Sequence, residues 1–296
     1  MSLCRLLFLT ATCAWATLTF AHAQDYSLPL EHTYSVGQRW KETRSATERV
    51  YRVIEPHGKP AQREIVDARA DAEYELKVLE VNAQGAPTKA EITILALNFQ
   101  TPKGKVEALP AKSVVTASLD AQGQTQFEGK LSEEAQQALR LSVSLGRSPL
   151  EDQAAFAPAA ATALNTSWTL DGAKVGASLQ RQGFQADKAQ FTGSLQMQAA
   201  PAFEKNETLR LTAKFEVSGV IPPGTGGDKS KLKLNVGTFK VDAFVRLPLN
   251  IKLPKLEESY LISIIFTGQE GPPETATRIE LTRKLWWQSH VEPLNP

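Results

Sequence analysis

The chain has 296 residues, with 33 Lys+Arg against 32 Asp+Glu, 42% hydrophobic residues and 22% charged residues. This composition is typical of a globular protein. The balanced charge argues against nucleic-acid binding, which usually comes with a basic excess. The apolar content excludes disorder over the full length.

Residues 1–23 have the pattern of a secretory signal peptide. Arg5 precedes the uncharged run Leu6–Ala21, and the segment ends in Ala21-His22-Ala23, a typical cleavage site. We expect a periplasmic or secreted protein that starts at Gln24 and lacks both Cys4 and Cys13. Such a chain has no disulfide, thiol nucleophile or Cys-based metal site. An uncleaved membrane anchor and a lipidated Cys13 are the alternatives.

The first half of this mature chain predicts two hairpins. Residues 73–81 and 90–97 alternate between apolar and polar side chains around the turn at 82–85. Residues 114–119 and 125–127 flank the turn at 120–123 in the same way. Alternating runs on either side of a Gly-containing turn are typical of antiparallel hairpins.

One helix is predicted at 132–145. Ser132 can serve as its N-cap, Glu133 and Glu134 occupy its first turn, and Gly146 follows its end. Each feature is typical of a helix terminus. The Ala-rich stretch at 154–163, which contains Pro158, predicts a linker, with a short helical turn as the alternative.

After Trp168 the strand-like pattern returns. The segments with alternating character are 208–217, 231–236, 238–245, 259–266 and 277–285. Pro248 and Pro254 flank residues 249–253, so that segment is expected on a sheet edge or outside the sheet.

These elements predict a β-rich α+β fold, with antiparallel sheets in two lobes and a half-barrel as one arrangement. The expected lobes are residues 24–150 and 165–296, joined by a linker at 151–164. The mature chain exceeds the common size of a single core, and the segments 36–40 and 164–168 each end in Trp, a weak sign of duplication. One continuous sheet system is the alternative, and no later segment is apolar enough to span a bilayer.

The sequence carries no specific catalytic motif. Pro222–Ser230 resembles a phosphate-binding loop, but Asp228 separates Gly227 from Lys229 and a strand, not a helix, is predicted to follow. The histidines at 32, 57 and 290 lack metal-ligand spacing and are expected on the surface. We expect no catalytic residue, metal or cofactor, although a Ser–His–Asp triad assembled in space stays open.

Aromatic residues are the candidates for ligand binding. Trp286 and Trp287 are adjacent, so on a strand their rings point to opposite faces, one of them into the core. The apolar segments 239–245, 247–253 and 261–266 could line a concave surface. The candidate ligand-binding residues are Trp40, Trp168, Phe239, Phe244, Phe266, Trp286 and Trp287.

The order of these features resembles a family of uncharacterised exported bacterial β-rich proteins with a domain of unknown function. The shared features are the signal segment, Gly37-x-x-Trp40, the strand pair within 74–97, the helix at Ser132 and the entry into a second β half at Trp168. A second resemblance, in architecture only, is to periplasmic lipoprotein-carrier proteins, and it implies a half-barrel around an apolar cavity.

These observations favour an exported, non-enzymatic protein that binds a lipid or other apolar ligand, or a protein partner in the cell envelope. A hydrolase with a spatially assembled site and an envelope structural or assembly protein are the alternatives. No nucleic-acid partner is expected.

Overall fold

A computed structural model describes residues 25–294, except 122, 146–151, 182–183, 188, 222–231, 235–236 and 273–274. The predicted signal peptide, the loop at Pro222–Ser230 and the helix stop at Gly146 lie outside the described residues.

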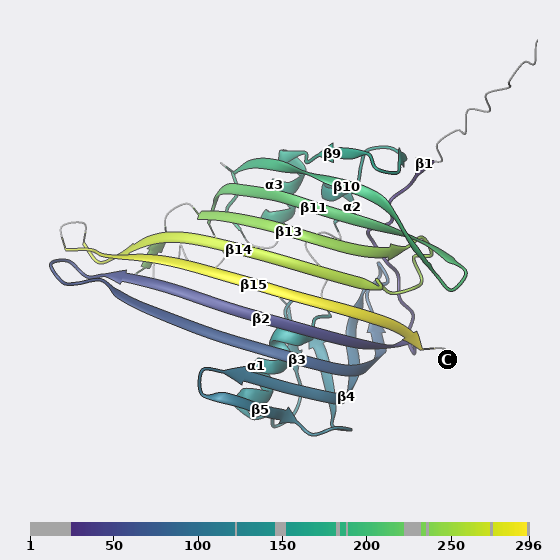
Figure 1. The fold of residues 1–296 in the computed structure, drawn as a ribbon, viewed down its shortest axis with the longest axis horizontal. Coiled ribbons are helices and arrows are strands. Elements are labelled where there is room, and N and C mark those ends of the chain that lie inside the picture. Colours follow the sequence, from purple (N-terminus) through teal and green to yellow (C-terminus); the bar gives the residue numbers. More distant parts are fainter. Residues whose placement is uncertain are drawn as a thin grey trace, which may run out of the picture.

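The chain folds around one open antiparallel sheet of 13 strands (Figure 1). From one edge to the other, its main path runs β7-β6-β4-β3-β2-β15-β14-β13-β11-β10-β9, with β5 paired to β4 and β12 paired to β14. The strands are β2 (Arg39–Glu55), β3 (Gln62–Val81), β4 (Pro87–Thr101), β5 (Gly104–Leu109), β6 (Val114–Leu119), β7 (Thr125–Phe127), β9 (Ser167–Thr169), β10 (Gln190–Phe203), β11 (Asn206–Val220), β12 (Leu232–Leu234), β13 (Gly237–Pro248), β14 (Glu257–Glu270) and β15 (Thr277–Leu294). A separate pair joins β1 (Asp25–Tyr26) to β8 (Thr162–Ala163).

The predicted fold class is confirmed: the protein is a β-rich α+β protein with antiparallel pairing and a helix in the expected place. Both predicted hairpins form, as β3–β4 and β6–β7. Residues 249–253 lie outside the sheet, in turns. The boundaries of the two lobes and their linker stay a prediction.

The last strand of the chain lies in the middle of the sheet. β15 pairs with β14 on one side and with β2 on the other, in a register that runs from Arg39↔Leu294 to Glu55↔Arg278. The first and last long strands are therefore neighbours, and their pairing joins the N-terminal part of the sheet to the C-terminal part.

Two hydrophobic clusters pack on the sheet. One gathers buried side chains from β3, β4 and β6, together with Ala138 and Leu139 of α1 (Glu133–Ser142). The other gathers side chains from β10, β11, β13 and β14, with Phe156 of α2 (Gln153–Phe156) and Val175 of α3 (Gly172–Arg181). Strand register places both sets on the same face of the sheet, so the helices cover that face at its two ends.

Helix α1 begins as predicted. The Ser132 hydroxyl accepts a hydrogen bond from the Ala135 amide at 3.1 Å, which satisfies one of the free N–H groups of the first turn. Among the helices formed by the described residues, none combines the length and the apolar character that a membrane crossing requires.

Helix α3, at Gly172–Arg181, was not predicted from the sequence. Asp171 accepts hydrogen bonds from the amides of Ala173 and Lys174, as an N-cap does. Gly172 and Gly176 both face Phe191, and a Cβ on Gly172 would lie 2.9 Å from the Phe191 ring. The glycines allow this close approach, but their low helix propensity hid the helix in the sequence.

The N-terminal segment at 28–34 crosses between the two clusters. Leu28 and Leu30 are buried in the C-terminal cluster, where the backbone of both is bound by the Gln153 side chain. The Thr33 amide donates to Ile251 O, and the Tyr34 amide donates to Gly85 O. The segment therefore links parts of the chain that are distant from one another in sequence.

Candidate functional site

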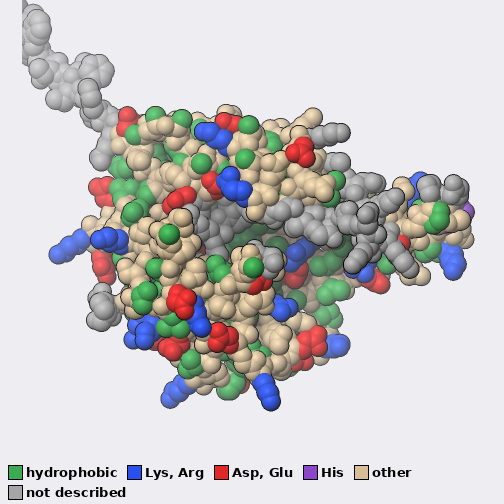
Figure 2. Space-filling model, turned by 180° about the vertical axis from the view of Figure 1, so that it is seen from behind, with side chains coloured by type: hydrophobic (Ala, Val, Ile, Leu, Met, Phe, Trp, Pro, Cys, Tyr) green, Lys and Arg blue, Asp and Glu red, His purple; other side chains and the backbone are tan. Residues whose placement is uncertain are grey.

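A pocket with a volume of about 600 Å³ lies on the helix-covered face of the central strands. Its walls come from β2, β3, β14 and β15, from α1 with residues 143–145, and from residues 254–255. Seen from behind, the molecule is hollowed between its two halves, and hydrophobic side chains line the hollow (Figure 2). A volume of this size suits a small organic ligand, for which pockets measure roughly 300–1,000 Å³.

Small side chains on β2 and β3 border the space. Ala68, Ala70 and Ala72 follow one another on the inner face of this strand, opposite Glu48, Ala46 and Arg44 of β2. Interiors normally pack at the density of organic crystals. Of these positions, Ala46 and Ala68 line the pocket, and their short side chains leave room above the sheet, whereas Ala70 and Ala72 are buried in the N-terminal cluster.

The middle of the pocket is apolar. Ala46 of β2 pairs with Trp287 of β15, and Phe99 and Leu285 also line this part. The Trp287 ring stacks on buried Tyr260, with ring centroids 4.5 Å apart. These side chains offer a surface for a hydrocarbon group.

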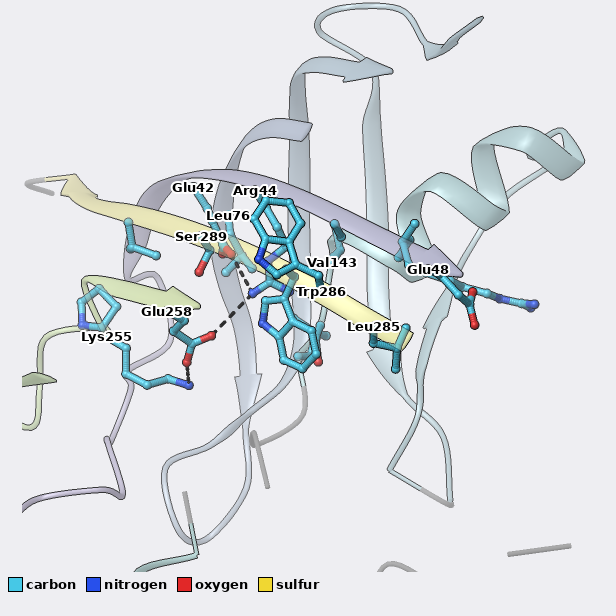
Figure 3. A pocket seen from close by; sticks show the side chains of 18 of the residues that line it. Glu42, Arg44, Glu48, Leu76, Val143, Lys255, Glu258, Leu285, Trp286 and Ser289 are labelled. Carbon is cyan, nitrogen blue, oxygen red and sulfur yellow. Dashed lines mark hydrogen bonds and ion pairs between the residues drawn. The ribbon is translucent and has the colours of Figure 1, made fainter. Parts of the chain in front are cut away.

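One end of the pocket carries buried charges (Figure 3). Arg44 lies 2.9 Å from Glu42 and 3.9 Å from Glu258, and Glu258 also pairs with Lys255. The side chains of these four residues are between 8% and 14% exposed. We call them the charge cluster, and its two positive and two negative formal charges cancel.

The close contacts in and around the charge cluster shift the pKa values of its residues and of Tyr74. Burial lowers the pKa of Arg44, but Glu42, Tyr74 and Glu258 outweigh burial and leave the pKa above its usual value. Burial raises the pKa of Glu258, but Lys255 and Arg44 outweigh burial and leave it below its usual value. Burial also raises the pKa of Tyr74, which keeps its phenol neutral. Arg44 and Glu258 therefore stay charged at neutral pH.

His32 corrects the expectation of surface histidines, because it is 2% exposed at this end of the pocket. Its Nδ1 lies 2.7 Å from Leu253 O. Burial lowers its pKa to about 4, so the ring is neutral at pH 7. A carbonyl only accepts, so Nδ1 carries the proton and Nε2 is left as an acceptor.

Three buried polar atoms at this end have no hydrogen-bond partner among the described residues. They are His32 Nε2, Arg44 Nε and Ser289 Oγ. Glu42 Oε1 also lacks a hydrogen bond of good geometry, but it faces the Arg44 guanidinium. Leaving buried polar atoms unpaired is unfavourable by about 1–3 kcal/mol each, so this end is suited to a polar group of a ligand.

The opposite end of the pocket is more exposed. Glu48 and Arg283 form an ion pair there at 2.5 Å, with side chains 27% and 46% exposed. Arg140 of α1 and Val66 of β3 also line this end. The pocket therefore runs along the strands from a buried, charge-balanced end, through an apolar middle, to a wetter end.

The predicted ligand-binding residues fall into separate places. Trp40, Trp286 and Trp287 border the pocket, but the register places the Trp286 side chain, paired with Thr47, on the opposite face of the sheet. As predicted, the adjacent Trp pair splits between faces: Trp287 packs on the core, whereas Trp286 is 36% exposed.

The other candidates do not line the pocket. Phe239 is buried in the C-terminal cluster, and Trp168 packs against that cluster and donates to Phe156 O at 3.0 Å. Phe266 is buried. Phe244 lies on the opposite face of β13, under the guanidinium of Arg210 at 4.5 Å.

The polar residues of the pocket were not predicted as site residues; they are His32, Glu42, Arg44, Lys255, Glu258 and Ser289. A signal exists in β2, where Trp40, Glu42, Arg44 and Ala46 are spaced by two residues and share one face of the strand. Two charged residues between apolar ones on such a row indicate a polar patch in a core. The described residues contain no group of three or more His, Cys, Asp or Glu side chains placed to hold a metal ion.

The protein is thus an open antiparallel sheet with a pocket that is apolar in the middle and polar at one end.

No family model and no curated protein matches the chain. Among solved structures, a lipovitellin, described with its lipid–protein interactions, matches with a TM-score of 0.27 and 9% identity over 88% of this chain and 26% of that chain. The present chain thus spans about a quarter of that protein.

Two bacterial structures match at lower TM-scores. A DUF1329 family protein from Desulfovibrio piger has a TM-score of 0.14 and 10% identity over 81% of this chain and 84% of that chain. A putative outer membrane lipoprotein-sorting protein domain from Vibrio parahaemolyticus has a TM-score of 0.14 and 8% identity over 85% of this chain and 86% of that chain. Similarity this low indicates neither fold nor function.

Proposed function

We propose that the protein is a non-enzymatic binding protein of the cell envelope that holds an amphipathic lipid in this pocket. The observation that carries the proposal is the composition of the pocket along its length, with apolar walls at Ala46, Leu285 and Trp287 followed by the charge cluster. A hydrocarbon chain would cover the apolar walls, and a polar head would face the buried polar atoms. The signal-peptide pattern of residues 1–23 supports an envelope or extracellular location.

The proposal is tested first by identifying what the protein carries. Native mass spectrometry of the protein purified from its own source, followed by organic extraction, should reveal a lipid in fixed stoichiometry. The same preparation, delipidated, should bind a fluorescent acyl probe that natural lipids displace. A clean protein without a lipid that also fails to bind the probe would refute the proposal.

A filled pocket provides the matched test. Ala68 lines the pocket on β3, so Ala68→Phe places a ring in the space that the chain of a lipid would occupy. Thr47→Phe puts the same ring on the opposite face of the neighbouring strand. We expect Ala68→Phe to lose probe binding and Thr47→Phe to keep it, with both variants folded by circular dichroism. Equal binding by the two variants would place the ligand elsewhere.

A further inference from the structure

The charge cluster restricts the class of ligand head that the pocket can accept. Arg44 and Lys255 balance Glu42 and Glu258, and His32 beside them is neutral. Removing a charge from water is unfavourable unless it is paired. A carboxylate or phosphate placed here would add an unpaired negative charge to a buried group that is already neutral in sum.

The guanidinium of Arg44 is not free to receive an anion. Its Nη2 lies 2.9 Å from Glu42 and 3.9 Å from Glu258. An anionic head would compete with both carboxylates for the same cation and would be repelled by them. At the low effective dielectric of a buried site, this repulsion is stronger than in water.

The unpaired atoms at this end define what could bind instead. Arg44 Nε donates a hydrogen bond, His32 Nε2 accepts one, and the Ser289 hydroxyl does both. A carboxylate only accepts and an ammonium group only donates, so neither would satisfy the set. A hydroxyl group donates and accepts without adding charge, and an ester carbonyl supplies a further acceptor.

We infer that the buried end of the pocket receives an uncharged, hydroxyl-bearing head, as in a monoacylglycerol, and discriminates against fatty acids and lysophospholipids. This inference rests on the proposed function, because it assigns the head group of the lipid held there. The hydrocarbon chain would then run past Ala46 and Leu285 toward the Glu48–Arg283 ion pair. Arg140 and Arg283 lie at that far end, where a reversed ligand would put an anionic head.

The test compares three ligands with the same acyl chain: monolaurin, laurate and lauroyl lysophosphatidic acid. Each displaces a fluorescent acyl probe from the delipidated protein at pH 8, below its own micelle-forming concentration. We expect monolaurin to bind about tenfold or more tightly than either anionic ligand, which corresponds to about 1.4 kcal/mol. Laurate or the phospholipid binding as tightly as monolaurin would overturn the inference.

Changing the charge balance should change the selectivity. Glu258→Gln leaves the cluster with one net positive charge, so the affinity for laurate relative to monolaurin should rise about tenfold. Lys255→Met leaves one net negative charge, and the same ratio should fall. Arg49→Gln, an exposed residue of β2 that does not line the pocket, should leave the ratio unchanged. A folded Glu258→Gln protein without this shift, or a shift caused by Arg49→Gln, would overturn the inference.

The two proposals fail in different ways. If none of the three ligands displaces the probe and the probe itself does not bind, the proposed function fails. A different result would refute only the inference about the head. In that case all three ligands bind with similar affinity, and Ala68→Phe abolishes the binding of each. If Glu258→Gln does not fold, Lys255→Met and the wild-type comparison still decide.

Discussion

The rings of Tyr260 and Trp287 stack with centroids 4.5 Å apart and planes 21° apart. Tyr260 of β14 is 1% exposed and belongs to the C-terminal cluster, whereas Trp287 of β15 faces the pocket. The pair therefore connects the core of the C-terminal half with the wall of the site. Stacked aromatic pairs contribute about 0.5–1.5 kcal/mol beyond the burial of their area.

Trp287→Ala should lower the free energy of unfolding by about 3 kcal/mol, since it removes the stack and opens a cavity beside Tyr260. Trp286→Ala, the adjacent and more exposed residue, should have a clearly smaller effect. Urea unfolding followed by circular dichroism measures both. Equal losses for the two variants would mean that the stack does not stabilise the fold.

Arg44→Met should destabilise the protein by about 3–5 kcal/mol, because Glu42 and Glu258 would lose their shared cation while staying buried. Arg49 of the same strand pairs with Asp67 but is 61% exposed, so Arg49→Met should have little effect. Chemical denaturation at pH 7 compares the two. Adding Glu258→Gln to Arg44→Met should recover part of the loss, and failure to do so would count against electrostatic coupling within the cluster.

His32 should make stability depend on pH. Its pKa is about 4 in the folded protein, because of burial, against 6.5 when unfolded. Between these values the unfolded chain binds the proton and the folded chain does not, so stability falls as pH drops from about 6.5 to about 4. The expected loss is about 3 kcal/mol, and it levels off below the folded pKa.

The measurement is the free energy of unfolding across this pH window. His32→Gln should remove this part of the slope, whereas His57→Gln, an exposed residue, should leave it. Glu258 adds a loss at lower pH, because its folded pKa lies below its usual value and its stabilisation disappears as pH falls through that pKa. An unchanged slope in His32→Gln would contradict the prediction.

Ser132→Ala should destabilise the protein by about 1 kcal/mol, since the Ala135 amide loses its capping acceptor. Because α1 contributes Gln137, Arg140 and Leu141 to the pocket, the affinity for an acyl probe should fall as well. Ser194→Ala, at an exposed position of β10, is the control. Thermal unfolding and probe titration would show a loss for Ser132→Ala alone.

The sequence predicts the individual strands and helix α1 better than it predicts how the strands are paired in the sheet. Alternation revealed β3, β4, β6 and β13, where one face is apolar and the other polar. It did not reveal β2, because the inner face of this strand carries Glu42, Arg44 and Glu48, which look like solvent-facing residues. The pairing of β15 with β2 depends on contacts between residues more than two hundred positions apart, and no local pattern encodes such contacts.

The site was predictable only through its aromatic residues. Trp40 and Trp287 have their rings on the pocket face, since large apolar rings favour partly buried positions. The charged residues could not be assigned, because a single Arg or Glu in a strand looks the same whether it faces water or a pocket. His32 shows the same limit, since its burial comes from residues near Leu253.

The central position of β15 has a consequence for how the protein is made. Its partner β2 is synthesised early, and β15 is the last strand to be completed. Until it arrives, β2 and β14 each present an unpaired edge, which is a template for joining other chains. Contacts so distant in sequence also form slowly. Before β15 is added, the protein therefore exposes two unpaired strand edges. A chaperone that covers strand edges at this stage would prevent aggregation.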